Sequence, residues 1–109
     1  MSKSKKAKRT FPTVDISGDK YKVHFGIIAM DRYHEITGES TDKILADLKK
    51  DRSKVRIKDL AKLYYSTLSR IDGKEVLSWE DFYEELDADM SLFNDMTNAV
   101  NKQTEEKKA

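Results

Sequence analysis

Arg56 to Ile71, RIKDLAKLYYSTLSRI, is the stretch that decides the fold. At about 100° per residue its apolar side chains fall on one arc roughly 100° wide, the width of the buried stripe of a core-facing helix. These side chains are Ile57, Leu60, Ala61, Tyr64, Leu68 and Ile71. Leu63 and Tyr65 flank the arc, so the apolar surface is too broad for one neighbour. The pattern predicts a central helix from Ile57 to Ile71 that contacts at least two other elements.

Before this helix, alternating apolar residues predict a short β-hairpin. The alternating residues are Val14 and Ile16 in the first strand and Tyr21, Val23 and Phe25 in the second. Ser17 to Lys20 separates the strands and supplies turn residues. Two short strands are marginal in isolation, so one face of the hairpin is expected to lie on the helices. His24 falls on the opposite face and is expected to be exposed.

Further helices are expected on both sides of the central one. They are predicted at Ile27 to Thr37, Asp42 to Lys50, Trp79 to about Leu86, and Asp89 to Gln103. Gly38 suits the end of the first helix, Ser40 or Thr41 can cap the second, and Ser78 with Asp81 resembles a capping box for the third. The predicted fold is therefore mainly α, of the α+β class: a short N-terminal β-hairpin followed by about five helices packed around a central helix.

Length and composition limit the class of protein. With 109 residues the chain is expected to form one domain with a single core. It has no apolar run near the roughly 20 residues that span a bilayer, and no apolar segment follows its basic N-terminus, so neither membrane insertion nor secretion is expected. The absence of cysteine excludes disulfides, thiolate metal sites and cysteine nucleophiles. A cytoplasmic location fits these features.

The charge is divided unevenly along the chain. Five cations in the first ten residues, Lys3, Lys5, Lys6, Lys8 and Arg9, leave 16 basic and 20 acidic side chains in the other 99 residues. Residues 1–10 have no apolar periodicity and are predicted to be a disordered basic arm. The helical domain is expected over residues 11–103, with a frayed tail over residues 104–109. The arm is either a nucleic-acid-binding or acidic-partner-binding segment, or a solubilising leader.

No catalytic, metal or cofactor motif is found. The histidines, His24 and His34, lie on different predicted elements, and the four glycines are scattered singly, so there is neither a phosphate-binding loop nor a dinucleotide fingerprint. A calcium loop aligned on Gly73 would place Leu68 and Trp79 at ligand positions, where neither can coordinate calcium through its side chain. We expect a non-enzymatic protein without a metal site or a cofactor.

The densest aromatic patch lies on the last two predicted helices. It is either ordinary core or, if partly exposed, the best candidate for a groove that binds another protein. The candidate partner-binding residues are Trp79, Phe82, Tyr83, Phe93, Met96 and Val100.

The order of these elements resembles that of the tail assembly chaperones of long-tailed bacteriophages and prophages. The similarity covers about Tyr21 to Val100. It includes a hairpin ending at Phe25-Gly26, a helix closing at Thr37-Gly38, a long helix with Leu60, Leu63, Tyr64, Tyr65 and Leu68, an amphipathic helix opened by Ser78-Trp79-Glu80-Asp81, and a last helix. The hydrophilic leader before Phe11 is not part of the family pattern.

The resemblance implies a non-enzymatic protein of the bacterial host cytoplasm that binds the long, hydrophobic tape measure protein. It also implies that the protein helps the tail tube protein polymerise, and in many family members a ribosomal frameshift yields a longer form. Self-association stays open. One competing interpretation is a small nucleic-acid-binding protein that uses Lys3 to Arg9, against which the net charge of −4 of the other 99 residues argues. The other is a different small phage structural or connector protein.

Overall fold

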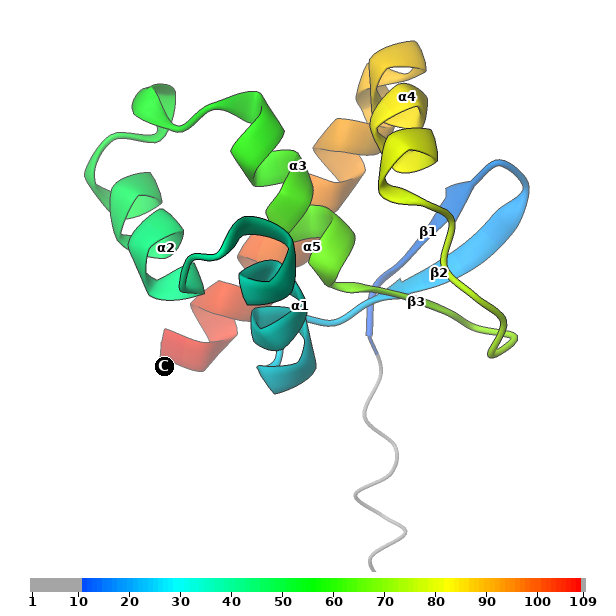
Figure 1. Ribbon diagram of the computed structural model, residues 1–109, viewed down its shortest axis with the longest axis horizontal. Coiled ribbons are helices and arrows are strands. Elements are labelled where there is room, and N and C mark those ends of the chain that lie inside the picture. Colours follow the sequence, from blue (N-terminus) through cyan, green and yellow to red (C-terminus); the bar gives the residue numbers. More distant parts are fainter. Residues whose placement is uncertain (1–10, 109) are drawn as a thin grey trace, which may run out of the picture.

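The computed structural model describes residues 11–108, with side chains described as far as Gln103. Its elements are β1 (Thr13–Ile16), β2 (Asp19–Val23), α1 (Ile27–Thr37), α2 (Thr41–Lys50), the 3-10 helix η2 (Arg52–Lys54), α3 (Ile57–Ser66), β3 (Leu68–Arg70), α4 (Trp79–Ala88) and α5 (Met90–Lys108). Most of these residues are helical and three short strands form one antiparallel sheet, which confirms the predicted α+β class (Figure 1). None of the helices within residues 11–108 is long and apolar enough to cross a membrane. The arm predicted over residues 1–10 lies outside the described residues.

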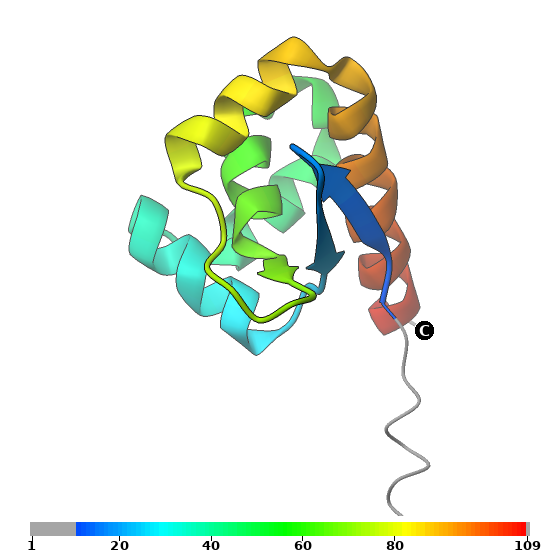
Figure 2. The same cartoon turned by 90° about the vertical axis from the view of Figure 1, so that its right-hand side faces the viewer.

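Helix α3 is the centre of the fold, as predicted. Helices α1, α4 and α5 pack on it, and α5 also lies alongside β1 (Figure 2). Leu60, Ala61, Leu63 and Tyr64 of α3 are buried. Around them the core is completed by residues of the sheet, α4 and α5, including Tyr21, Val23, Phe82 and Met96.

The central helix ends at Ser66, five residues before the predicted end at Ile71. The hydroxyl of Thr67 donates a hydrogen bond of 2.6 Å to the carbonyl oxygen of Tyr64, and the Ser66 hydroxyl donates one of 2.9 Å to that of Lys62. Such hydroxyls compete with the backbone donors that would continue a helix. Burial of Ile57 and Ile71 was also a wrong prediction, because their exposed fractions are 60 % and 56 %.

After Ser66 the chain forms β3, a strand that the sequence did not predict. Leu68 pairs with Val23 and Arg70 with Tyr21, so the sheet has the order β1-β2-β3 instead of being a two-stranded hairpin. The backbone N–H of His24 donates to the carbonyl oxygen of Thr67 at 3.0 Å and extends the pairing. Leu68 is fully buried, but in the sheet and not on a helix.

Arg32 of α1 fixes the point where helix α3 becomes strand β3. Its Nη1 donates hydrogen bonds to the carbonyl oxygens of Leu68 at 2.8 Å and Ser66 at 3.5 Å. The last carbonyls of a helix lack partners within the helix, and a cation at that end also complements the helix dipole. Arg32 therefore stabilises the early end of α3 from a different element.

The predicted hairpin is confirmed, and the apolar side chains of both strands are buried in the core. Ser17 and Gly18 form its two-residue turn with φ of 53° and 85°, the left-handed values that type I′ hairpin turns require. His24 is exposed, as predicted, and its ring centroid lies 4.3 Å from that of Phe11.

Residues that favour the beginning or the end of a helix also predicted most helix boundaries correctly. Gly38 ends α1 with φ of 78°, and the Ser40 and Ser78 hydroxyls accept backbone hydrogen bonds at the starts of α2 and α4. The carboxylate of Asp89 caps α5 by accepting from the N–H of Ser91 at 3.0 Å. Helix α5 continues to Lys108, five residues beyond the predicted helix end at Gln103, so that predicted end is wrong. The frayed tail predicted over residues 104–109 stays a prediction. The residues beyond Gln103 include glutamates and lysines, which are good helix formers.

Gln103 joins the end of α5 to the sheet. Its side-chain Oε1 accepts a hydrogen bond of 2.7 Å from the N–H of Phe25, and its Nε2 donates one of 2.9 Å to the carbonyl oxygen of Val23. The amide thereby pairs with backbone groups at the end of β2 as a neighbouring strand would.

Candidate functional site

The structure divides the six predicted partner-binding residues into two groups. Phe82, Met96 and Val100 are buried in the core and cannot contact a partner while the domain stays folded. Trp79 and Phe93 are half-buried, and Tyr83 is exposed. In the second group, Trp79 at the start of α4 stacks on Tyr83 in the middle of that helix, and Phe93 lies near the start of α5.

The aromatic residues of α4 hold this helix against α3. The ring of Tyr65 lies 5.5 Å from that of Phe82 and 5.8 Å from that of Trp79, and Trp79 stacks on Tyr83 at 5.0 Å. The Tyr65 hydroxyl also donates a hydrogen bond of 2.6 Å to the carbonyl oxygen of Leu77, just before α4. Burial raises the pKa of this hydroxyl above its ordinary value. The cluster fixes α4 and presents the outer face of Tyr83 to solvent.

Beside this cluster lies an apolar groove bounded by the start of α3, the second half of α4 and the start of α5. Its volume is about 380 Å³, near the lower end of the roughly 300–1,000 Å³ found for ligand pockets. Its lining residues are Ile57, Tyr83, Glu84, Leu86, Asp87, Met90 and Phe93. Ile57 and Met90 are 60 % and 61 % exposed, which is high for large apolar side chains.

Sequence reasoning missed Ile57 and Met90 as site residues, because both were assigned to buried helical faces. Each is the first residue of its helix, and the neighbouring helices cover only the later turns. Position within the helix was the signal that could have separated them from Leu60 and Met96.

Charged side chains of both signs lie near the groove. On the α4 side the carboxylates of Glu84 and Asp87 line it, and residues 79–89 contain six acidic side chains and no basic one. In the sequence Ile57 stands between two exposed cations, Arg56 and Lys58, and neither is among the residues that line the groove. The Nζ of Lys58 lies 6.0 Å from the centroid of the Tyr83 ring. The charged side chains that line the groove itself are therefore the two carboxylates.

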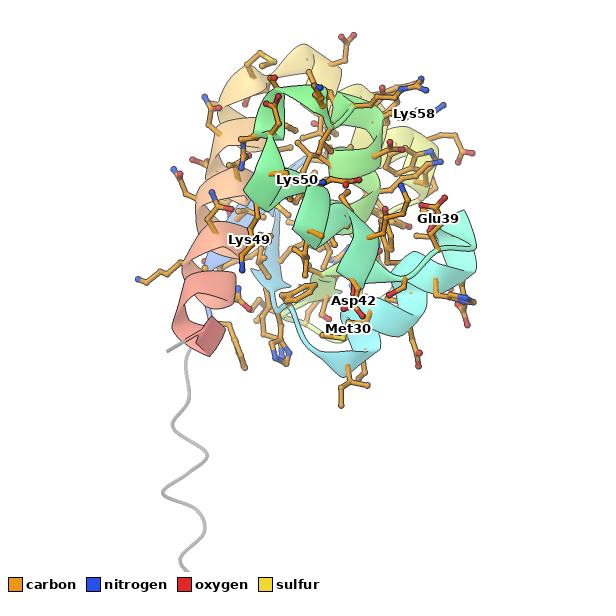
Figure 3. All side chains as sticks on the ribbon, turned by 90° about the vertical axis from the view of Figure 1, so that its left-hand side faces the viewer. Met30, Glu39, Asp42, Lys49, Lys50 and Lys58 are labelled. Atoms are coloured by element: carbon orange, nitrogen blue, oxygen red, sulfur yellow. The ribbon has the colours of Figure 1, made fainter. Side chains whose placement is uncertain are left out.

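A second surface surrounds η2. Six exposed cations follow one another over ten residues, Lys49, Lys50, Arg52, Lys54, Arg56 and Lys58, with one acid, Asp51, among them. Figure 3 looks onto this side of the molecule and labels Lys49, Lys50 and Lys58. Next to this basic band a hollow of about 520 Å³ separates α2 from α3 and α5, with Leu45, Leu48 and Tyr64 among its lining residues.

The polar groups near the hairpin tip hold local structure together. The guanidinium of Arg70 contacts the carboxylates of Asp19 at 3.2 Å and Asp72 at 2.6 Å, and its hydrogen bonds hold the pKa of Asp72 below its ordinary value. Within residues 11–103 no three histidine, aspartate or glutamate side chains gather in a way that could hold a metal ion.

No family model, curated protein or solved structure matches this chain. Among the features of the described residues, the apolar groove is the one best suited to binding another protein.

Proposed function

We propose that this protein is a non-enzymatic phage tail assembly chaperone that binds the tape measure protein and assists tail tube assembly in the cytoplasm of the bacterial host. The observation that carries the proposal is the groove formed by α3, α4 and α5, with Ile57 and Met90 exposed beside it. The family resemblance implies a long, hydrophobic client, and such a client needs apolar surface that can cover its own. The order of the elements, a hairpin followed by helices of which the last two are amphipathic, also supports the proposal.

The groove provides this surface on a rigid base. Covering a large aliphatic side chain contributes about 1.5–3 kcal/mol, so Ile57 and Met90 together offer a substantial part of a protein–protein contact. The side chains beneath them, Leu86 and Phe93, are buried and half-buried and pack with the core. A client segment can therefore dock without unfolding the domain.

The test is to co-express this chain with the tape measure protein of the same phage and to measure how much of that partner stays soluble and co-purifies. Ile57→Asp and Met90→Asp should each lower this amount severalfold. Matched controls are Ile71→Asp and Ile28→Asp, because these isoleucines are 56 % and 68 % exposed but lie outside the groove. All four variants should keep the circular dichroism spectrum and the thermal midpoint of the wild type within a few degrees.

Two results would overturn the proposal. The tape measure protein could be equally soluble without this chain, or it could never co-purify with it. If the control variants lowered co-purification as much as the groove variants do, the chaperone role would stand but the groove would not be its site.

A second candidate function, nucleic-acid binding, is favoured by the basic band from Lys49 to Lys58. Cations in a row are the usual footprint for phosphate contacts, although α4 gives the domain an acidic face as well. Gel-shift measurements with double-stranded DNA at several salt concentrations would test it. Salt-dependent binding that is lost in a Lys49→Glu/Lys50→Glu/Arg52→Glu variant, and retained after removal of residues 1–10, would place this function in the folded domain.

A further inference from the structure

The charged side chains that line the groove all have the same sign. They are the carboxylates of Glu84 and Asp87, which are both exposed, and no lysine, arginine or histidine lines the groove with them. Among residues 11–103 neither carboxylate forms an ion pair with a cation. The other lining residues are apolar or aromatic. A segment that fills the groove therefore meets apolar surface together with two negative charges that no described residue pairs.

Two cations stand near the groove without lining it. Arg56 and Lys58 flank Ile57 in the sequence, and the Nζ of Lys58 lies 6.0 Å from the centroid of the Tyr83 ring. Against these two, residues 79–89 hold six acidic side chains and no basic one. Helix α4, which supplies most of the lining residues, is thus strongly acidic, and its field attracts a cationic segment.

We propose that the groove binds a basic amphipathic helix, whose apolar stripe is flanked by lysine or arginine side chains. The stripe covers Ile57 and Met90, and the cations lie beside Glu84 and Asp87. Charge pairs of this kind add little to affinity when exposed, but they discriminate between partners of opposite charge. This inference rests on the proposed function, because the helix would belong to the client.

A helix suits this groove better than a strand. All the lining residues come from α3, α4 and α5, so the groove exposes no strand edge to which an added strand could hydrogen-bond. A helix satisfies its own backbone groups and presents apolar side chains at positions i, i+3, i+4 and i+7. The volume of about 380 Å³ accommodates a small number of such side chains.

The probes are three synthetic peptides of about 18 residues, or about five helical turns, with the same leucine stripe. The stripe is flanked on both edges by lysine in the basic peptide, by glutamine in the neutral peptide and by glutamate in the acidic peptide. Each peptide carries the same fluorescent dye at its N-terminus. Fluorescence anisotropy of the dye then gives the Kd of each peptide for the full chain.

For the wild-type protein the basic peptide should bind most tightly, the neutral peptide less tightly and the acidic peptide least. The basic and acidic peptides should differ about threefold to tenfold in Kd, the effect expected of a few exposed ion pairs. Raising the salt concentration from about 0.05 M to about 0.5 M should shrink this difference, because exposed charges are screened.

Charge reversal in the groove gives the sharpest prediction. In a Glu84→Lys/Asp87→Lys variant the charged lining residues are both cations, so the acidic peptide should become the tightest ligand and the basic peptide the weakest. The matched control is Asp31→Lys/Glu35→Lys, which changes the net charge equally at exposed positions of α1 that do not line the groove. It should leave the wild-type order of affinities intact.

The apolar part of the site is tested without a change of charge. Met90→Ser removes an exposed apolar side chain from the groove, so it should weaken the binding of all three peptides severalfold. Ile28→Ser is its control, because Ile28 is 68 % exposed and lies outside the groove. Binding that is unchanged by Met90→Ser would overturn the inference.

The same charge reversal connects the peptides to the client. Co-expressed with the tape measure protein, the Glu84→Lys/Asp87→Lys variant should co-purify severalfold less of it than the wild type does, whereas Asp31→Lys/Glu35→Lys should co-purify as much. An equal amount with the groove variant would overturn the inference that the client helix is basic.

The remaining outcomes separate this inference from the proposed function. Equal affinities for the three peptides, or an order of affinities that the groove reversal leaves unchanged, would each overturn the inference. So would the absence of binding by all three peptides while the tape measure protein still co-purifies. Failure of the tape measure protein to co-purify with the wild-type chain would instead overturn the proposed function.

Discussion

Helices α2 and α4 lie on two sides of α3 and are held to the protein in different ways (Figure 1). Each has 10 residues and a serine at its N-cap. Helix α4 inserts Phe82 fully into the core, and Tyr65 and Trp79 surround that ring. Helix α2 buries Ile44, but its leucines are only half-buried beside the 520 Å³ hollow.

In α4 the residue that stabilises the domain, Phe82, and the residue that offers a binding surface, Tyr83, lie on different faces of one helix. The aromatic cluster fixes α4 from the inside, so the outer residues Tyr83 and Glu84 stay in place beside the groove. Helix α2 has no such anchor among the described residues, and its outer face carries charge. We therefore expect α2 to be the less stable side and α4 to be the pre-organised one.

The largest expected effect compares one core residue from each side. Phe82→Ala should lower the free energy of unfolding by about 3–5 kcal/mol, because it leaves a large cavity among rings that cannot collapse. Ile44→Ala should cost about 2 kcal/mol, because the hollow beside α2 lets neighbours relax into the space. Urea denaturation measures both values. Equal losses would show that α2 is anchored as firmly as α4.

Native-state hydrogen exchange should show the same contrast without mutation. Amides of α2, such as those of Leu48 and Lys49, should exchange through local opening at a free energy below that of global unfolding. Amides of α4, such as that of Leu86, should approach the global value. Similar protection in the two helices would contradict the comparison.

A smaller effect tests the hydrogen bond that precedes α4. Tyr65→Phe removes the donor to the carbonyl oxygen of Leu77 and keeps the ring, so it should cost about 0.5–1.5 kcal/mol. Tyr83→Phe is the control, since it removes the hydroxyl of an exposed tyrosine on α4. If the two variants were equally stable, the packing of the rings alone would hold α4.

The smallest effect concerns pH at the turn that leads into α4. Because Arg70 lowers the pKa of Asp72 in the folded protein, Asp72 stabilises the fold above its unfolded pKa of about 3.9, and this contribution is lost as the pH falls through the folded value. Asp72→Asn should therefore flatten the loss of stability between about pH 5 and pH 2. Glu35→Gln, on the exposed face of α1, should leave that slope nearly unchanged.

Features encoded by neighbouring residues were predictable from the sequence. The Ser17-Gly18 turn, the Ser40 and Ser78 caps and Gly38 at the end of α1 all act within a few residues of their position in the chain. Strand β3 was not predictable in this way. The apolar spacing of this segment is compatible with a helix. The segment forms a strand instead because Leu68 pairs with Val23 and accepts a hydrogen bond from Arg32, two residues that are distant in the sequence.

The candidate site was predicted in part for a related reason. Periodicity located the apolar faces of α4 and α5, and thereby found Tyr83 and Phe93. It could not show that Phe82 and Met96 face inward, because that depends on the angle at which the two helices cross α3. Ile57 and Met90 have the same chemistry as core residues and differ from them only in lying beyond the ends of their neighbours.

The hydrogen bonds of Gln103 have a consequence for synthesis of the chain on the ribosome. Its partners, Val23 and Phe25, are made some 80 and 78 residues earlier, so the bonds at the end of β2 form only after α5 has been translated as far as Gln103. Strand β3 also reaches β2 only after α3 has been made. Contacts so distant in sequence close large loops and form late. We therefore expect the segment before α5 to stay unfolded until α5 emerges from the ribosome, and the domain then to fold as one unit.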